Sequence, residues 1–523
     1  MSRQSFIKGA LILLAAGILN RILGFVPRIA LPRMIGAEGI GLYQMAYPFM
    51  IVLLTIITGG IPLAVAKLVA EADADGRPDK IKRVLRIALA VTISGAIVFT
   101  TLSLIFSDAI TSKWFTDERV YYSYVAMTPI LLLAGISSVF RGYYQGLHNM
   151  IPTALSQTAE TIIRIIAALL LAYLFLPYGV QFAAAGAMLG VVTGELVGLL
   201  VLIFPFFRKR AASSQARQAV NRAHSSLTRG DSLSARLFQV AIPVTASRLV
   251  GSGSYFLESI MTVQCLAAAG IATAVATTQY GILQGMAMPI LLLPTALTYS
   301  LAVALVPSLS EAAHRNDRRT VHKRLHQSLK MSMIAGAPFA IIMFVLAVPI
   351  CQVAFNHSEA GIMLRMMAPI ALFIYFQAPL QAALQALERP GSALLNTLIG
   401  AVTKLSLIAI LASNPALGIL GVVIAINVNI ALVTALHWLS VSRLLRFTMS
   451  ILDFLKLGTA IGLSGVCCSL LWKHVWLAYS SSLRLLMIIP ITLVIYLICC
   501  LILKLIDRAD LERLRWLYKK IAR

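Results

Sequence analysis

Apolar stretches of about 20 residues or more recur along almost the entire chain, and they constrain its fold more than any other feature. The stretch 181–207, for example, contains a single ionisable residue, Glu195. A helix of this length crosses the hydrocarbon core of a bilayer and satisfies its own backbone hydrogen bonds. Charged residues make up 12% of the chain, whereas soluble proteins carry roughly 25%. The sequence therefore predicts a membrane protein and excludes a water-soluble globule.

The apolar stretches predict an all-α polytopic membrane protein with about 14 transmembrane helices. The expected spans are 6–30, 40–69, 85–107, 121–147, 152–176, 181–207, 235–260, 271–308, 329–353, 361–387, 392–412, 417–442, 457–477 and 483–505. Two of them, 40–69 and 271–308, are overlong and contain more than one proline. Transporters tolerate such breaks where the backbone lines a cavity or packs on protein.

An internal repeat divides these helices into two lobes of six, followed by two C-terminal helices. Met127-x-Pro129-Ile130 matches Met367-x-Pro369-Ile370 at a shift of 240 residues, and Arg164 falls on Lys404 at the same shift. An even number of helices per repeat keeps both lobes in one orientation, which is a parallel repeat. The predicted domains are an N-lobe at 1–207, a basic cytoplasmic linker at 208–232, a C-lobe at 233–443, two further helices at 444–505 and an amphipathic cytoplasmic tail at 506–523.

The net charge of +24 describes mainly the orientation of the chain in the membrane. The predicted topology places 32 of the 44 Lys and Arg residues on the side of both termini, 7 on the opposite side and 5 inside helices. The positive-inside rule then makes both termini cytoplasmic. Nucleic acid is not an expected partner, because nucleic-acid-binding domains are not built from apolar 20-residue runs.

Ionisable residues at membrane depth are the strongest candidates for function, because each costs at least about 2.5 kcal/mol at a helix centre unless it is paired or hydrated. The interior cations are Arg21, Lys67, Arg164, Arg248 and Lys404, and the interior acids are Glu160, Glu195 and Glu258. A cavity with this positive excess favours an anionic ligand, such as a diphosphate or a carboxylate-bearing glycolipid.

The first helix presents Gly17, Arg21, Gly24 and Arg28 on one face. Glycines leave the arginine between them uncovered, which favours a cavity wall. A close helix–helix seam, with the arginine paired elsewhere, is the alternative.

The three interior acids allow two interpretations. Glu160 and Arg164 lie four residues apart, so they form either a pair within one helix or part of a charged wall. Glu195 and Glu258 are candidate sites for a coupling proton or sodium ion, together with Glu160, or they are structural partners of Arg248.

Known catalytic signatures are missing from the sequence. It contains no GxxxxGK[ST], HExxH or GxSxG pattern, so we expect neither an enzyme nor a metal site nor a bound cofactor. Transport would then draw on a coupling cation or on the membrane potential. A cation-coupled exporter of small, drug-type molecules and a membrane scaffold that recruits synthases remain alternatives to a lipid transporter.

Several strings resemble the polysaccharide branch of the multidrug/oligosaccharidyl-lipid/polysaccharide exporter superfamily. They are the segments 20–28, 33–37, 140–146, 176–179, 184–188 and 384–387. The resemblance implies a lipid II flippase-like carrier of an undecaprenyl-linked peptidoglycan precursor that acts in spore cortex formation. It further implies cortex synthases as partners and a location in the bacterial cell membrane, in particular the forespore outer membrane. It also implies substrate-binding roles for Arg21 and Arg33, with Arg248 as their counterpart in the second lobe. Arg28, Arg164 and Lys404 complete the expected cavity.

Overall fold

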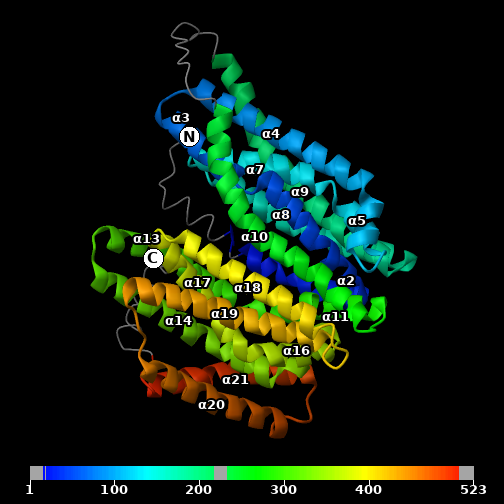
Figure 1. Ribbon diagram of the computed structural model, residues 1–523, viewed down its shortest axis with the longest axis vertical. Helices are drawn as coiled ribbons and strands as arrows, with labels where there is room; N and C mark the ends of the chain where they lie inside the picture. Colours follow the sequence, from blue (N-terminus) through cyan, green and yellow to red (C-terminus); the bar gives the residue numbers. More distant parts are fainter. Residues whose placement is uncertain (1–15, 18, 217–232, 506–523) are drawn as a thin grey trace. The chain divides into compact units, whose positions relative to one another are not determined.

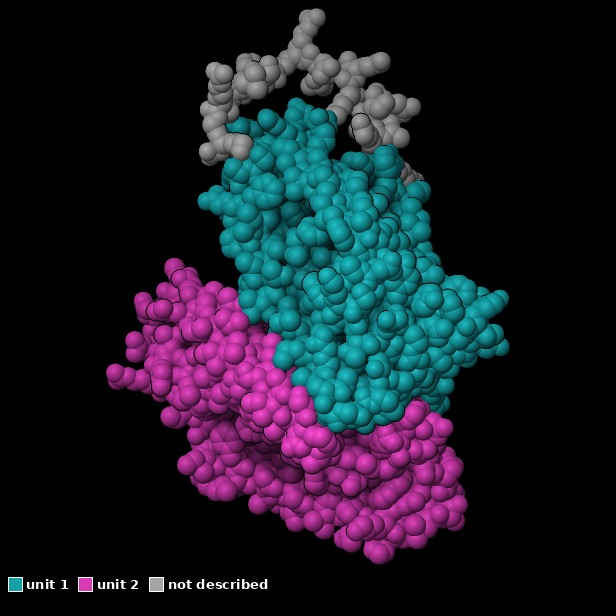
Figure 2. Space-filling model, turned by 45° about the vertical axis from the view of Figure 1, so that its right-hand side comes forward, with its two compact units in different colours: residues 1–281 teal, residues 282–523 magenta. Residues whose placement is uncertain are grey.

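The computed structural model describes residues 16–17, 19–216 and 233–505, and within these ranges every regular element is a helix (Figure 1). The chain divides into two compact units, 1–281 and 282–523, which are coloured separately in Figure 2. The predicted tail at 506–523 and most of the predicted linker lie outside the described residues. The all-α membrane fold expected from the sequence is confirmed.

Eleven helices of the described residues are long and apolar enough to cross a membrane. The two expected spans at 6–30 and 40–69 are represented by one continuous stretch, Leu19–Ala74, and the expected spans at 235–260 and 271–308 are not among the eleven. The total of about 14 spans therefore stays a prediction.

Most of the long helices of unit 1 begin or end next to a glycine or a proline. Its elements are α2 (Phe25–Thr58), α3 (Ile61–Ala74), α4 (Pro78–Ile105), α5 (Ser107–Trp114), α6 (Val120–Met127), α7 (Ile130–Gly146), α8 (Ile151–Phe175), η1 (Leu176–Tyr178), α9 (Val180–Ala216), α10 (Leu233–Ala268) and α11 (Thr273–Ile282). Helix α2 is kinked at Gly36, whose φ of 70° is a left-handed conformation that glycine adopts readily. Gly59 and Gly60 separate α2 from α3, where Pro62 occupies the first turn.

Unit 2 repeats this construction and adds two helices. Its elements are η3 (Leu283–Ala287), α12 (Met288–Leu292), α13 (Thr295–His314), α14 (Arg318–Val345), α15 (Ala347–Phe355), α16 (Glu359–Met367), η4 (Ala368–Ile370), α17 (Ala371–Ala386), α18 (Pro390–Leu411), α19 (Ile419–Leu445), α20 (Ile451–His474) and α21 (Ser481–Ile502). The expected break in 271–308 is present, because η3 is a π-helical turn and α12 ends just before Pro294.

The structure reproduces the internal repeat at the register read from the sequence. The bounds of α4 and α14 differ by 240 residues at both ends. The turns before them contain Gly76 and Asn316 at φ 65° and 54°, and the turns after α7 and α17 contain His148 and Glu388 at φ 53° and 57°. Each pair is again 240 residues apart, so the repeat extends to the backbone conformation of the turns.

The compact units are divided at a different place from the predicted lobes. Helix α10, which the sequence assigns to the start of the C-lobe, packs against α2 and α3 in unit 1. A Cβ atom at Gly60 would lie 2.1 Å from the carbonyl oxygen of Ala241, and the Gly60 N–H donates to Thr245 Oγ1 over 2.9 Å. The missing side chains at the α2–α3 turn therefore let α10 approach its backbone. The predicted boundary between the lobes therefore describes the internal repeat and not the division into compact units.

Candidate functional site

A ladder of glycines on α9 positions the charged residues of unit 1. Gly186, Gly190, Gly194 and Gly198 recur every four residues along the face of α9 that packs against α8. A Cβ atom at Gly190 would lie 2.2 Å from the Ala168 backbone. Small residues at this spacing let membrane helices approach closely. The sequence interpretation did not use this ladder, although its spacing was the signal that could have revealed the α8–α9 seam.

Next to this seam, Arg141 of α7 bridges two carboxylates from different helices, one buried and one largely buried. Its Nη2 lies 2.8 Å from Glu160 Oε2 on α8 and 3.3 Å from Glu195 Oε1 on α9. Arg164 Nη1 lies 3.3 Å from Glu160 Oε1, which confirms the pair within α8. The two carboxylate side chains are 13% and 8% exposed. Together these four residues form a charge network of two acids and two arginines.

Arg141 is the residue of this network that sequence analysis missed. It lies near the end of the fourth expected span and is not among the interior cations named from the sequence, whereas the structure directs it to Glu160 and Glu195. No local pattern links Arg141 to Glu195, 54 residues away. Only the packing of α7 against α9 brings them together.

Arginines and tyrosines from three helices converge on one face of unit 1, which we call the Arg–Tyr face: Arg28, Tyr43 and Tyr47 of α2, Arg164 of α8 and Tyr255 of α10. The Tyr43 and Tyr47 rings stack with centroids 6.1 Å apart. Tyr43 lies within electrostatic range of Arg28 and Arg164, and Tyr255 lies within range of Glu258 and of Arg28. Guanidinium groups bind phosphates, and tyrosine rings pack against apolar surfaces while their hydroxyls make hydrogen bonds.

The other predicted site residues are placed as follows. Arg21, Arg28 and Arg33 are exposed on the N-terminal part of unit 1, and Arg248 is exposed on α10. Glu258 is buried on α10, at 5% exposure. Lys404 is also buried, at 8% exposure, on α18 of unit 2. The structure thus brings Arg28, Arg164 and Glu160 into one region of unit 1, and the binding roles of the remaining residues stay predictions.

A second polar network ties the loop before α6 to α2 and α11. Asp117 is 4% exposed and accepts hydrogen bonds from Arg119 Nη2 at 2.8 Å and from Thr277 Oγ1 at 2.9 Å. Arg119 also donates to Glu38 Oε1 at 2.6 Å. Burial raises the pKa of the Asp117 carboxyl, but the hydrogen bonds from Arg119 and Thr277 lower it by more, so the pKa lies below its usual value.

Replacing Asp117 with asparagine is expected to lower the free energy of unfolding by about 1–3 kcal/mol, because the charge-assisted bonds of Arg119 are lost. A carboxyl with a depressed folded pKa stabilises the fold above its unfolded pKa of about 3.9, and this contribution disappears as pH falls through the folded value. Thermal unfolding of the purified protein between pH 3 and 7 measures both effects. The parent should lose more stability than Asp117→Asn below pH 4, and parallel curves would contradict the assignment.

Sequence relatives of the chain include two sporulation proteins and a lipid II flippase of one organism. Stage V sporulation protein B of Bacillus subtilis (strain 168) is 40% identical over 514 residues, which cover 98% of each chain. Residues 6–313 match the family described as polysaccharide biosynthesis protein. The chain belongs to this family. Residues 252–410 also match the MatE family. Lipid II flippase MurJ of the same organism is 25% identical over 420 residues, or 77% of each chain.

Solved structures with the same fold are transporters. Lipid II flippase MurJ in an inward closed conformation aligns with a TM-score of 0.72 at 16% identity, over 94% of this chain and 98% of that one. A multidrug resistance MATE family transporter in an inward-facing conformation aligns with a TM-score of 0.64 at 16% identity, over 84% and 98%. The chain is an integral membrane protein with the MurJ/MATE-type transporter fold, and it is not an enzyme.

Proposed function

We propose that this protein is an alternating-access flippase for an undecaprenyl-linked peptidoglycan precursor and that it supports spore cortex synthesis. The Arg–Tyr face is the observation that supports this proposal, because it combines guanidinium groups with aromatic hydroxyls on one wall of unit 1. The printed names of the relatives, a sporulation protein and a lipid II flippase, point to the same class of cargo. Cytoplasmic termini, a forespore outer membrane location and cortex synthases as partners belong to this proposal.

In this mechanism Arg28 and Arg164 bind the diphosphate of the lipid-linked sugar, and the tyrosines contact its sugar rings. Guanidinium groups suit this task because they remain charged and form two parallel hydrogen bonds to phosphate oxygens. The polyprenyl chain stays in the surrounding lipid throughout, so no hydrocarbon has to be transferred into water. No cofactor is required, and a coupling cation or the membrane potential supplies the energy. Cation coupling through Glu160 or Glu195 would require Arg141 to release them first.

The double variant Arg28→Gln/Arg164→Gln is expected to slow translocation of the headgroup at least about tenfold, because each lost charge-assisted hydrogen bond is worth roughly 1.5–3 kcal/mol. Proteoliposomes containing a fluorescent lipid-linked precursor measure the rate through the accessibility of the headgroup to a quencher. Arg83→Gln/Arg86→Gln is the matched control, since both arginines are exposed on α4 and the net charge changes equally. Translocation at the parental rate in the first variant would remove the Arg–Tyr face from the binding site.

The match of residues 252–410 to the MatE family keeps a cation-coupled small-molecule exporter as a second candidate. That function predicts efflux of a dye in vesicles that contain no lipid-linked sugar, with efflux lost in Glu258→Gln. A scaffold for cortex synthases predicts instead that deletion of residues 506–523 abolishes cortex formation while flipping in proteoliposomes persists.

A further inference from the structure

The four charged residues Arg141, Glu160, Arg164 and Glu195, which we call the Arg141 network, contain as many acids as arginines. Arg141 Nη2 lies 2.8 Å from Glu160 Oε2 and 3.3 Å from Glu195 Oε1. Arg164 Nη1 lies 3.3 Å from the other oxygen of Glu160. Glu160 is therefore shared between two guanidinium groups. Arg141 makes the shorter contact, so it contributes more than Arg164 to neutralising this carboxylate.

Arg164 is the member of the Arg141 network that is most accessible to a ligand. Its side chain is 36% exposed, against 23% for Arg141 and 13% for Glu160. Within the described residues, Nη1 is the only side-chain atom of Arg164 that donates a hydrogen bond. Tyr43 of α2 lies within electrostatic range of Arg164. Arg164 thus belongs both to the network and to the Arg–Tyr face, so the charge of the network acts directly on that face.

The internal repeat indicates that the fold does not require acids at these positions. At the shift of 240 residues the cation is kept, because Arg164 falls on Lys404, but Glu160 falls on Gly400. Helices α17, α18 and α19, which take the places of α7, α8 and α9 in the repeat, contain no Asp or Glu. These three helices pack without a carboxylate, and burying a charge costs free energy. The acids of unit 1 therefore require an explanation other than packing.

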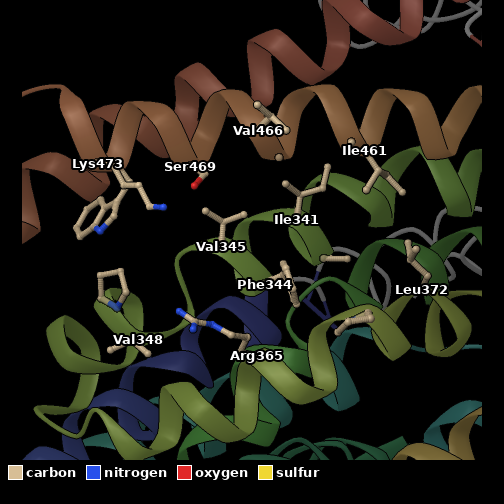
Figure 3. Close-up of a pocket in the computed structure, with 16 residues that line it drawn as sticks. Ile341, Phe344, Val345, Val348, Arg365, Leu372, Ile461, Val466, Ser469 and Lys473 are labelled. Atoms are coloured by element: carbon tan, nitrogen blue, oxygen red, sulfur yellow. The ribbon is translucent and has the colours of Figure 1, made fainter.

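A groove in unit 2 offers a comparison. It lies between α14 and α20 and has a volume of about 910 Å³ (Figure 3). Arg365 and Lys473 are among the residues that line it, and none of these lining residues is Asp or Glu. The lining of this groove thus contains cations without carboxylates, whereas Arg164 shares Glu160 with a second arginine. The combination of arginines with acids distinguishes the Arg141 network.

We propose that Arg141 is a positioning residue that sets the affinity of Arg164 for the diphosphate of the cargo. This inference rests on the proposed function, in which Arg164 binds that diphosphate. Arg141 neutralises the acids, so the charge of Arg164 stays directed at the ligand. Without Arg141, one arginine faces two acids, Glu160 draws Arg164 into a complete pair, and the negative excess repels phosphate. Without Glu160, the excess is positive and Arg164 binds phosphate more tightly.

Binding of inorganic pyrophosphate to the full chain in nanodiscs tests the proposal, because this probe carries the diphosphate without lipid or sugar. Isothermal titration calorimetry gives the Kd. We expect the Kd to rise about fivefold in Arg141→Gln and to fall about fivefold in Glu160→Gln, because one unit of charge changes beside Arg164 at low local dielectric. Asp79→Asn is the matched control for Glu160→Gln. It removes an acid whose side chain is 93% exposed in the first turn of α4, and it should keep the parental Kd.

The sign of the effect in Glu160→Gln separates a positioning role from a merely structural one. If the network only held α7, α8 and α9 together, loss of Glu160 would leave Arg164 less ordered and weaken binding. Unchanged or weaker binding in Glu160→Gln would therefore overturn the proposal. Two further variants address misfolding of Arg141→Gln. Arg141→Lys keeps the charge and Arg141→Gln/Glu195→Gln restores the balance, so both should bind pyrophosphate more tightly than Arg141→Gln.

Arg164→Gln distinguishes failure of this inference from failure of the proposed function. Parental affinity in Arg164→Gln would show that pyrophosphate binds elsewhere, which contradicts the positioning role. Weaker binding in Arg164→Gln, with parental Kd values in the Arg141 and Glu160 variants, would overturn the positioning role and leave the proposed binding site intact. The expected shifts of Kd without translocation of the headgroup in proteoliposomes would support the positioning role and contradict the flippase function.

Discussion

Replacing Arg141 with alanine is expected to lower the free energy of unfolding by about 3–5 kcal/mol, the cost typical of breaking a buried ion pair from one side. The arginine neutralises Glu160 and Glu195, whose side chains are 13% and 8% exposed. Without Arg141, Glu160 keeps only Arg164 as a partner, and Glu195 loses the arginine that neutralises it. Thermal unfolding of the purified protein in detergent measures the change, with Arg86→Ala as an exposed control.

A compensating variant separates the loss of charge balance from the loss of packing. Arg141→Ala leaves the charge of Glu195 buried without its partner. Adding Glu195→Gln removes that charge, so the double variant should recover part of the lost stability. An Arg141→Ala protein as stable as the parent would show that the acids are hydrated or protonated in the folded state. It would also restore Glu160 and Glu195 as candidate sites for a coupling ion.

The second large effect is expected at the α8–α9 seam. Gly190→Leu should prevent accumulation of folded protein, because even its Cβ would lie 2.2 Å from the Ala168 backbone and two helices would have to separate. Overpacking of a close interface costs about 1–3 kcal/mol and more when the neighbour is backbone. Gly95→Leu on α4 is the control, since nothing lies within 4 Å of the added Cβ. Fluorescence-detected gel filtration reports the folded fraction, and equal profiles for the two variants would contradict the close approach.

Much of the fold could be predicted because its signals are local. A run of apolar residues reports on membrane burial wherever it occurs, and proline and glycine mark breaks through their own backbone restrictions. The break within 271–308 was predicted for these reasons, whereas the repeat linking α4 to α14 was predicted from strings that match 240 residues apart. The total number of spans was not settled. The first two expected spans join in one helical stretch that begins at Leu19, and the spans expected at 235–260 and 271–308 are not among the eleven found in the described residues.

The candidate site was predictable only where its residues share a helix. Glu160 and Arg164 are four residues apart, so helical geometry alone brings their side chains together. Arg141 and Glu195 come from different helices, and their contact depends on how α7, α8 and α9 pack. The Arg–Tyr face likewise combines α2, α8 and α10, of which α10 was expected in the other lobe.

The sequence by itself determined that this protein is a bundle of membrane helices with a twofold internal repeat and buried charge. Membrane burial and buried charge follow from composition and from spacing over one or two helical turns, and the repeat follows from strings that match 240 residues apart. Only the tertiary structure decided which cation neutralises which acid and where α20 leaves a groove beside α14. The physical reason is that such contacts depend on the shapes of whole helix faces, and a missing side chain at Gly190 or Gly60 sets the approach of a helix far away in the sequence.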